Sequence, residues 1–227
     1  MSTAAAAVDL TDSSDATTVT VVSADVAELC DVTLGMPSYG VSLYDVSMRV
    51  PRGQVTAVVS PRDGAAGTVV DLLAGRAQAR WGVVHRVGTV AEVRRLVGLT
   101  RGRTVRDTLI EMRHDAGLEA DPGWVGTLAR TLALREAEGA RGPRDVDAQR
   151  VRWGLARALV AQPDLVVVDD LTGGYLRAAG EGVLEQLGAL ARASDTAVLV
   201  ATGDPAVADA VGHVVVLERG RVVEVSV

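Results

Sequence analysis

Valine-rich runs recur along the chain, and each stops at a proline, a polar residue or a charged residue. Four of them are almost continuous in apolar or β-branched residues, which is typical of strands buried on both faces of a parallel sheet. A fifth run follows a turn at Gly220 and predicts a terminal strand. The predicted strands are Val55–Ser60, Leu165–Val168, Ala197–Ala201, Val214–Leu217 and Arg221–Val225.

Between these runs, apolar residues recur at the spacing of a helix. The pattern predicts helices over Val146–Ala161 and Ala178–Ser194, and a short helix over Thr68–Arg76 that ends at a glycine. The stretch Arg103–Gly142 is rich in helix-forming residues, with a break at Asp121-Pro122-Gly123. Parallel strands alternating with helices indicate an α/β fold.

Length and composition set the domain organisation. The 227 residues suffice for one domain with an inserted subdomain, and 48% hydrophobic with 23% charged residues exclude a mostly disordered protein. Residues 1–17 are rich in Ser, Thr, Asp and Ala without periodicity, so we expect a disordered tail there. The single cysteine, Cys30, excludes a disulfide framework and a zinc site built from cysteines.

The charge pattern excludes further classes. A net charge of −6 gives no electrostatic footprint for nucleic acid, so no nucleic-acid partner is expected. No apolar run approaches the ~18 residues of a membrane-spanning helix, and no basic segment precedes the N-terminal alanines as in a secretory signal. We therefore expect a soluble cytoplasmic chain. All 23 cationic residues are arginine, so no lysine can form a Schiff base or bind phosphate in a P-loop.

Several landmarks follow one another in a familiar order. LLAG at Leu72–Gly75 ends a strand–loop–helix, LARAL at Leu155–Leu159 leads into VVVDD at Val166–Asp170, and VLVATGD at Val198–Asp204 precedes the last strands. This order resembles the nucleotide-binding domain of ABC transporters from about residue 28 to the C-terminus. Asp45–Gly53 resembles the strand pair that opens that domain.

The resemblance implies a specific architecture within the α/β class. It is an ABC-type core like that of P-loop NTPases, with a mixed, mainly parallel sheet, an antiparallel β part and an inserted helical subdomain. We expect the domain to span residues 18–227 and the helical subdomain to span about residues 103–160.

The stretch that matches the P-loop has lost its phosphate-binding chemistry. A P-loop uses glycines to bring backbone N–H groups to the phosphates, a lysine for the β/γ oxygens and a hydroxyl for Mg²⁺. Ser60 stands at the first glycine, Ala65 at the second, Ala66 at the lysine and Gly67 at the hydroxyl, while Thr68 is retained one place later.

Two charged residues lie inside the same loop. Asp63 places a carboxylate where an anion would bind, which disfavours the phosphate. Arg62 either replaces the lysine through bidentate phosphate contacts or is an exposed loop residue paired with Asp63. By position, the nucleotide site would comprise Tyr39, Ser60, Arg62, Gly64, Ala65, Ala66, Gly67, Thr68 and Asp169, with Asp169 and Thr68 as weak Mg²⁺ candidates.

The remaining motifs have changed as well. Asp169 stands at the Walker B carboxylate and Asp170 at the catalytic glutamate, where its shorter side chain would orient water poorly. In the alternative interpretation, both carboxylates are solvated or cap the next turn and have no part in catalysis. Gly203 stands at the position of the switch histidine, and Leu176 stands at the position of the aspartate that ends the D-loop. We therefore expect no catalytic residue in this chain.

Three further segments depart from the family pattern. Asp145–Gln149 stands at the signature but has no serine or glycine, and Asp145 or Asp147 there would cap a helix. The segment Thr100–Val105, where the Q-loop is expected, has no glutamine. Tyr39 could stack on adenine, with Tyr44 as the alternative, or both tyrosines serve packing.

These changes favour a degenerate ABC ATP-binding subunit that acts as a non-hydrolysing structural partner in a membrane transport complex. The resemblance implies ATP and Mg²⁺ as cofactors, whereas the changed motifs favour a chain that requires neither. The expected partners are a membrane-embedded transporter subunit, gripped through a groove near Thr100–Thr108, and a competent ABC ATPase subunit. The expected location is peripheral, at the inner face of the cell membrane. Two alternatives remain: a regulatory nucleotide binder and a weak ATPase with unorthodox phosphate contacts.

Overall fold

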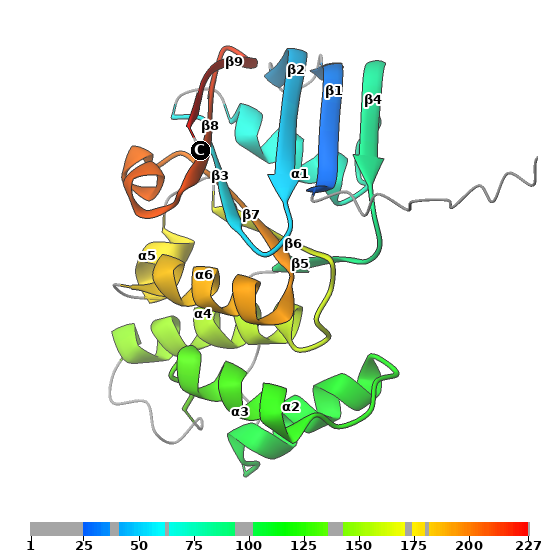
Figure 1. The fold of residues 1–227 in the computed structure, drawn as a ribbon. Helices are drawn as coiled ribbons and strands as arrows, with labels where there is room; N and C mark the ends of the chain where they lie inside the picture. Colours follow the sequence, from blue (N-terminus) through cyan, green and yellow to red (C-terminus); the bar gives the residue numbers. More distant parts are fainter. Residues whose placement is uncertain are drawn as a thin grey trace, which may run out of the picture.

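The computed structural model describes residues 25–36, 41–61, 64–93, 102–135, 143–170, 174–179 and 182–226. They form two sheets with a helix between them, and further helices that extend from one end of the larger sheet (Figure 1). No helix of the described residues is both long enough and apolar enough to cross a membrane.

The larger sheet has six strands in the order β5-β6-β7-β3-β8-β9. Every neighbouring pair is parallel except β8 and β9, which form an antiparallel hairpin. The sheet is therefore mixed and mainly parallel, as expected. Its strands are β3 (Val55–Val59), β5 (Val90–Val93), β6 (Leu165–Asp170), β7 (Ala197–Thr202), β8 (His213–Glu218) and β9 (Arg221–Ser226).

The smaller sheet is antiparallel and has the order β2-β1-β4. Its strands are β1 (Asp25–Met36), β2 (Val41–Pro51) and β4 (Trp81–Arg86). Helix α1 (Ala65–Leu73) contacts strands of both sheets. The antiparallel part of the expected architecture is thus present.

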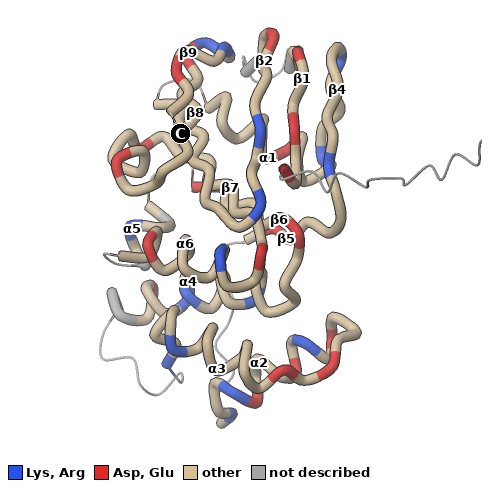
Figure 2. Tube along the Cα trace, viewed as in Figure 1, with Lys and Arg blue, Asp and Glu red and all other residues tan. Residues whose placement is uncertain are grey.

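Helices α2 (Val105–Asp115), α3 (Pro122–Thr131) and α4 (Pro143–Leu159) occupy the stretch in which a helical subdomain was expected. Figure 1 shows α2 and α3 at the end of the molecule opposite the smaller sheet. Asp121 accepts a hydrogen bond from the Trp124 backbone N–H, so the predicted break at Asp121-Pro122-Gly123 is the start of α3. Figure 2 shows acidic and basic residues interspersed on α2, whereas β3 and β7 carry no charge.

The core consists of two apolar clusters, one on each face of the larger sheet. Alternate residues of β6 divide between them: Val166 and Val168 join the cluster that contains α4 and α6, and Leu165 and Val167 join the cluster that contains α1. β7 divides in the same way. Burial on both faces explains why these strands are continuous apolar runs and not alternating ones.

The predicted helix over Ala178–Ser194 is wrong as a single element. The structure has a short helix α5 (Tyr175–Ala179) and a separate helix α6 (Val183–Ser194). Gly182 immediately before α6 has φ +77°, a left-handed conformation that an α-helix cannot contain. The apolar period of α6 was correct, but it does not extend to Ala178.

Other boundaries also moved. Helix α1 begins at Ala65, three residues before the predicted Thr68, and ends at Leu73. β1, β4 and β5 were not predicted as strands. β4 is almost entirely exposed, and the pairing of β1 with its neighbours shifts register at several points, so neither strand carries a clear two-residue apolar period.

Candidate nucleotide site

The loop that matches the P-loop joins the end of β3 to α1. Ser60 is buried, and its backbone N–H donates to the carbonyl of Thr202 at the end of β7 over 2.9 Å. Gly64 precedes α1 with φ +69°, which allows the chain to turn into the helix. The loop is thus held at the carboxyl ends of the parallel strands, where open α/β sheets bind ligands.

The first turn of α1 already has acceptors within its own chain. The Ser60 hydroxyl accepts a hydrogen bond from the Ala65 N–H over 3.2 Å, and the Gly67 N–H donates to the Gly64 carbonyl over 3.0 Å. A helix N-terminus binds phosphate because its first N–H groups lack partners. Two of those groups are engaged here.

The position of the missing lysine faces no solvent. Ala65 and Ala66 have no exposed surface and belong to the apolar cluster around α1, and Thr68 is 6% exposed. A longer side chain at Ala66 would have to displace packed neighbours. The retained Thr68 is likewise almost fully buried.

Asp169 and Asp170 end β6 on the other side of β7 from Ser60. Asp169 pairs with Ala201 and is exposed, and Asp170 pairs with Thr202 and is 1% exposed. Because Ser60 also contacts Thr202, the structure brings the Walker A and Walker B positions to one edge of the sheet. The Asp170 carboxylate accepts a hydrogen bond from the Leu176 N–H over 3.2 Å. It therefore holds α5 in place.

The switch-histidine position lies at the same edge. Gly203 is half-buried, and Asp204 beyond it begins the short 3₁₀ helix η2 (Pro205–Ala210) by accepting the Ala206 N–H over 3.0 Å. Arg177 donates to the other Asp204 oxygen over 2.5 Å. This hydrogen bond from Arg177, with that from Ala206, lowers the pKa of Asp204 from its usual value. Asp204 thus anchors η2 to α5.

The positions of the D-loop and signature are built into the chain's own packing. Leu176 is 3% exposed and belongs to the cluster beneath α5. Gln149 is buried on α4, where its amide accepts the Arg135 N–H over 2.8 Å and donates to the Ala133 carbonyl over 3.2 Å. Both groups stabilise contacts within the chain.

The expectation that Asp145 or Asp147 caps the signature helix is wrong. Helix α4 begins at Pro143, so both residues lie inside it. Asp147 is exposed and pairs with Arg150 three residues later, over 3.4 Å. Proline is common at the first helical position because its missing N–H needs no partner there, which explains the earlier start.

Several predicted site positions lie outside the described residues. They are Tyr39, Arg62, Asp63 and the first two residues of Thr100–Val105, the segment in which the Q-loop was expected. The alternative tyrosine, Tyr44, is 43% exposed on β2 and lies beneath the guanidinium of Arg221, 5.5 Å from the ring centroid.

A hollow also opens on the helical part, between α2 and the C-terminal end of α4. Its volume is about 360 Å³, and its walls include Thr108, Met112 and Val160 together with the charged residues Glu111, Asp115 and Arg157. The sequence pointed to a groove between the core and the helical subdomain, lined by residues around Thr100–Thr108, whereas this hollow lies within the helical part. Of that stretch, Thr108 lines the hollow, and the rest of its lining comes from further along α2 and from the end of α4.

The sequence of this chain is similar to those of known ATP-binding proteins. The chain is 28% identical over 208 residues to the lipoprotein-releasing system ATP-binding protein LolD of Pseudomonas syringae pv. tomato, an alignment that covers 83% of this chain and 91% of LolD. It is 27% identical over 241 residues to the methionine import ATP-binding protein MetN 2 of Paraburkholderia xenovorans, across 96% of this chain and 61% of MetN 2. The chain is a relative of the ABC ATP-binding proteins. No family model matches it.

Solved structures agree on the fold. An ATP-binding subunit of an ABC transporter superposes with a TM-score of 0.61 and 19% identity, covering 88% of this chain and 89% of that chain. The ADP conformation of an ATP-binding cassette superposes with a TM-score of 0.62 and 16% identity, covering 88% and 90%. The expected ABC-type fold, an α/β fold of the P-loop NTPase kind, is confirmed.

Proposed function

We propose that this chain is a degenerate ABC ATP-binding subunit that does not hydrolyse ATP and serves as a structural or regulatory partner in a membrane transport complex. The relatives carry names of lipoprotein-releasing and methionine-import systems, which supports a role in transport. The complex would contain a membrane-embedded subunit and an ABC ATPase subunit that retains its motifs. The chain would lie at the inner face of the cell membrane.

One observation carries the proposal: the first turn of α1 is occupied by the chain itself. The Ser60 hydroxyl engages the Ala65 N–H, and the lysine position is the fully buried Ala66. Hydrogen bonds to a charged group contribute about 1.5–3 kcal/mol each, so losing the lysine alone weakens phosphate binding by one to two decades. The described residues of this loop, Ser60 and Gly64–Thr68, do not fit a Mg²⁺-bound triphosphate.

The residues at the positions of the hydrolytic groups also support the proposal. The buried Asp170 carboxylate accepts the Leu176 N–H and so holds α5, and Gly203 offers no side chain to a γ-phosphate. Asp169 and Thr68 remain as oxygen ligands for Mg²⁺, but Thr68 is 6% exposed. Mg²⁺ needs octahedral oxygen ligation that is completed largely by water and substrate phosphates, and an almost fully buried threonine leaves little room for them.

The hollow between α2 and α4 supports a docking role. Apolar Met112 and Val160 line it, and its walls carry two carboxylates, Glu111 and Asp115, and the guanidinium of Arg157. An amphipathic helix binds a groove of this kind through spaced apolar anchors. We assign this hollow to a helix of the membrane-embedded partner.

Turnover by the purified chain tests the proposal. We expect no vanadate-sensitive ATP hydrolysis above that of a mock purification, and equal background rates for the natural chain and for Asp170→Asn. The thermal unfolding of Asp170→Asn is followed by circular dichroism, so that a folding defect is recognised. Asp169→Asn, which changes an exposed carboxylate, is the second variant.

Vanadate-sensitive turnover that falls in Asp169→Asn or in folded Asp170→Asn would contradict the proposal. It would show that the carboxylates at the Walker B positions still take part in ATP hydrolysis, and it would favour the weak ATPase. Saturable nucleotide binding without turnover would replace the structural partner with the regulatory nucleotide binder.

A further inference from the structure

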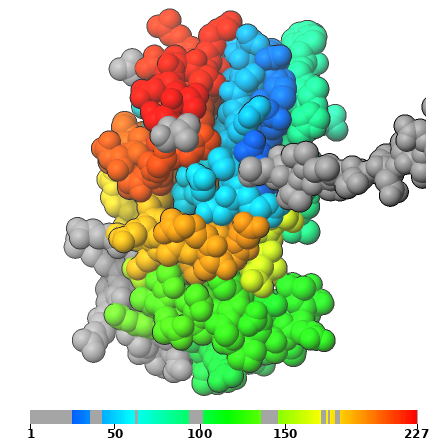
Figure 3. Space-filling view, viewed as in Figure 1, coloured from blue at the N-terminus to red at the C-terminus, as the bar shows by residue number. Residues whose placement is uncertain are grey.

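Strand β4 lies at an edge of the smaller sheet. Among the described residues, β1 is the only strand that pairs with it. Figure 3 shows β4 (turquoise) at the margin of the molecule, next to β1 and β2 (blue). An edge strand can pair with a strand of another chain, because its outer N–H and C=O groups have no neighbour within the sheet. The Walker A and Walker B positions end strands of the larger sheet, so β4 is separate from them.

The pairing with β1 shows which backbone groups of β4 face outward. The Val87 N–H donates to the Val26 carbonyl over 2.9 Å, and β4 pairs with β1 in a regular antiparallel register from Val83 to Arg86. In an antiparallel strand, successive residues direct their N–H and C=O groups to opposite sides. The backbone groups of Val83 and Val87 therefore face β1, whereas those of Val84 and Arg86 face away from it.

The same strand exposes apolar side chains. Trp81, Val83 and Val87 are each at least half exposed, and the guanidinium of Arg80 lies 4.4 Å from the centroid of the Trp81 ring. Val84 packs against the cluster around α1, so alternation along the strand places Val83 and Val87 on the outer face of the sheet. Exposed apolar residues on an edge strand favour association.

The cations of β4 restrict how two copies of this strand can pair. In an antiparallel pair around a two-fold axis, the residue at the centre lies opposite its own counterpart. Centring the pair on Arg86 sets two guanidiniums opposite each other, and centring it on Val83 sets Arg80 opposite Arg86. Centring it on His85 sets two imidazoles opposite each other, which repel once both are protonated. Like charges directly opposite destabilise a strand pair.

A pair centred on Val84 has no such conflict. The opposed residues are then Val84 with Val84, Val83 with His85, Arg86 with Gly82, and Trp81 with Val87. Gly82 has no side chain, so Arg86 has room to keep its hydrogen bond to the Leu73 carbonyl of its own chain, over 2.9 Å. The outward backbone groups of the two Val84 residues face each other across the axis and can exchange two hydrogen bonds.

We propose that β4 pairs antiparallel with β4 of a second copy of this chain, around a two-fold axis at Val84. The two smaller sheets then form one continuous sheet. A second copy is the partner that fits, because in this register the strand is complementary to itself, as a two-fold contact requires. The dimer does not depend on the proposed function. A contact made mainly by two short strands is small, so we expect a micromolar dissociation constant.

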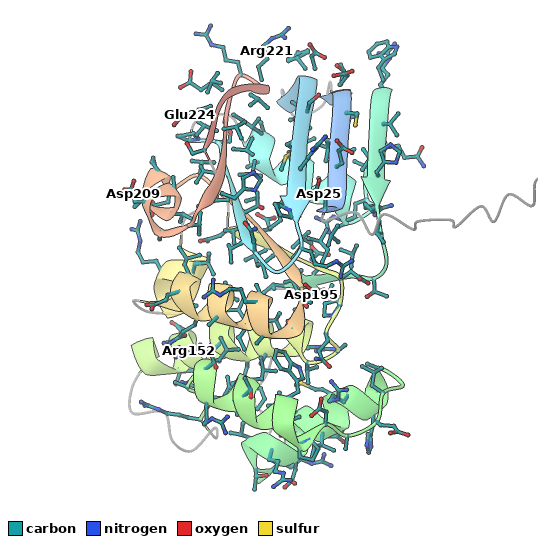
Figure 4. All side chains as sticks on the ribbon, viewed as in Figure 1. Asp25, Arg152, Asp195, Asp209, Arg221 and Glu224 are labelled. Atoms are coloured by element: carbon teal, nitrogen blue, oxygen red, sulfur yellow. The ribbon has the colours of Figure 1, made fainter. Side chains whose placement is uncertain are left out.

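Sedimentation velocity of the purified chain over a range of concentrations tests the proposal. We expect an equilibrium between monomer and dimer. Val83→Arg places a guanidinium opposite His85 of the second copy and is expected to weaken the dimer at least tenfold. Val223→Arg changes a valine of similar exposure on β9, between Arg221 and Glu224 in Figure 4, and should leave the dimer unchanged.

Disulfide cross-linking tests the register. Chains with Val83→Cys are mixed with chains that carry His85→Cys, both in a Cys30→Ser background, and the mixture is oxidised. In the proposed pair these two positions lie opposite each other without exchanging hydrogen bonds, which brings their Cα atoms close enough for a disulfide. We expect a cross-linked dimer in the mixture and much less in either variant alone. Val223→Cys in the same background controls for random collision.

Three results would overturn the proposal. They are a monomer at every concentration, a dimer that Val83→Arg and Val223→Arg weaken equally, and cross-linking of either cysteine variant alone as efficient as that of the mixture. If the chain is monomeric, slow hydrogen exchange of the Val84 amide would assign the edge of β4 to another segment of the same chain. Circular dichroism melting of each variant separates a folding defect from a loss of association.

Discussion

At the scale of single residues, hydrogen bonds decide what each motif position now does. The sequence identified Ser60, Ala66 and Asp170 as departures from the family pattern, but a departure alone does not show where a side chain points. Ser60 on the Ala65 N–H and Asp170 on the Leu176 N–H depend on how the loops turn, which no local period encodes. For Asp170 the sequence left open whether the carboxylate is solvated or capping, and the structure has the capping contact.

Asp164 was not singled out in the sequence, yet it joins three turns. Its carboxylate accepts the Thr89 N–H over 2.8 Å and the Arg52 guanidinium over 3.1 Å. The Thr89 N–H, together with Arg52, lowers the pKa of Asp164 from its usual value. Only the assembled fold brings residues 75 and 112 positions away to this aspartate, so sequence spacing gives no signal for it.

We predict that Asp164→Asn lowers the free energy of unfolding at neutral pH by about 1–3 kcal/mol, because hydrogen bonds to a charged group are lost. Since the folded-state pKa of Asp164 is depressed, its stabilisation is present above the unfolded-state pKa and is lost as pH falls through the folded-state value. The difference between variant and natural chain in urea unfolding should therefore shrink in acid. Asp209→Asn on η2 is the control. A difference that grows in acid would contradict this role.

At the scale of elements, the hydrophobic period predicted the presence of α4 and α6 better than it predicted where these helices begin and end. The spacing of Leu187, Leu190 and Ala191 does mark the buried face of α6. The break before it depends on Gly182, whose left-handed φ of +77° no hydrophobic pattern reveals. β4 was missed because five of its six residues are exposed, so it has no apolar period, although Val84 packs against the cluster around α1 and the strand pairs with β1.

A pair of glycine variants tests this account of the break. Gly182→Ala is expected to destabilise the chain by about 1 kcal/mol, because alanine is strained at positive φ, although a Cβ there would meet no atom within 4 Å. Gly188→Ala inside α6 should instead stabilise by up to about 1 kcal/mol, since alanine favours helix and its Cβ has ordinary contacts. Both are measured by urea unfolding. Equal effects of the two would contradict the backbone explanation.

At the scale of the whole molecule, the order of strands and helices made the ABC-type fold recognisable even though the site motifs have changed. Core positions such as Val166 and Leu199 remain apolar because both faces of the sheet must be filled. The residues at the motif positions in the loops are constrained by the ligand that they bind and not by core packing. They can therefore change without loss of the fold when no ligand has to be bound. The fold was therefore predictable from the sequence, while the new contacts of the site were not.

The two apolar clusters share the strands of one sheet, so we expect them to unfold together. Trp124 and Trp153 report on the helical side once the third tryptophan, Trp81 on the exposed strand β4, is replaced by phenylalanine, and far-ultraviolet circular dichroism reports on the whole chain. Urea curves from tryptophan fluorescence and circular dichroism should coincide for the Trp81→Phe chain. Leu187→Ala in one cluster and Leu72→Ala in the other should each cost about 2–5 kcal/mol and keep a single transition. Separate transitions would show that the clusters are independent.

The most direct test of the central claim is a calorimetric titration of the purified natural chain with Mg²⁺ and ATP, up to millimolar nucleotide. An ABC ATP-binding protein that retains its P-loop lysine serves as the positive control. Because the Ala65 N–H is engaged by Ser60 and no lysine is present, we predict no saturable heat. Saturable binding with a micromolar dissociation constant would contradict the account, since it would mean that the loop still holds a triphosphate.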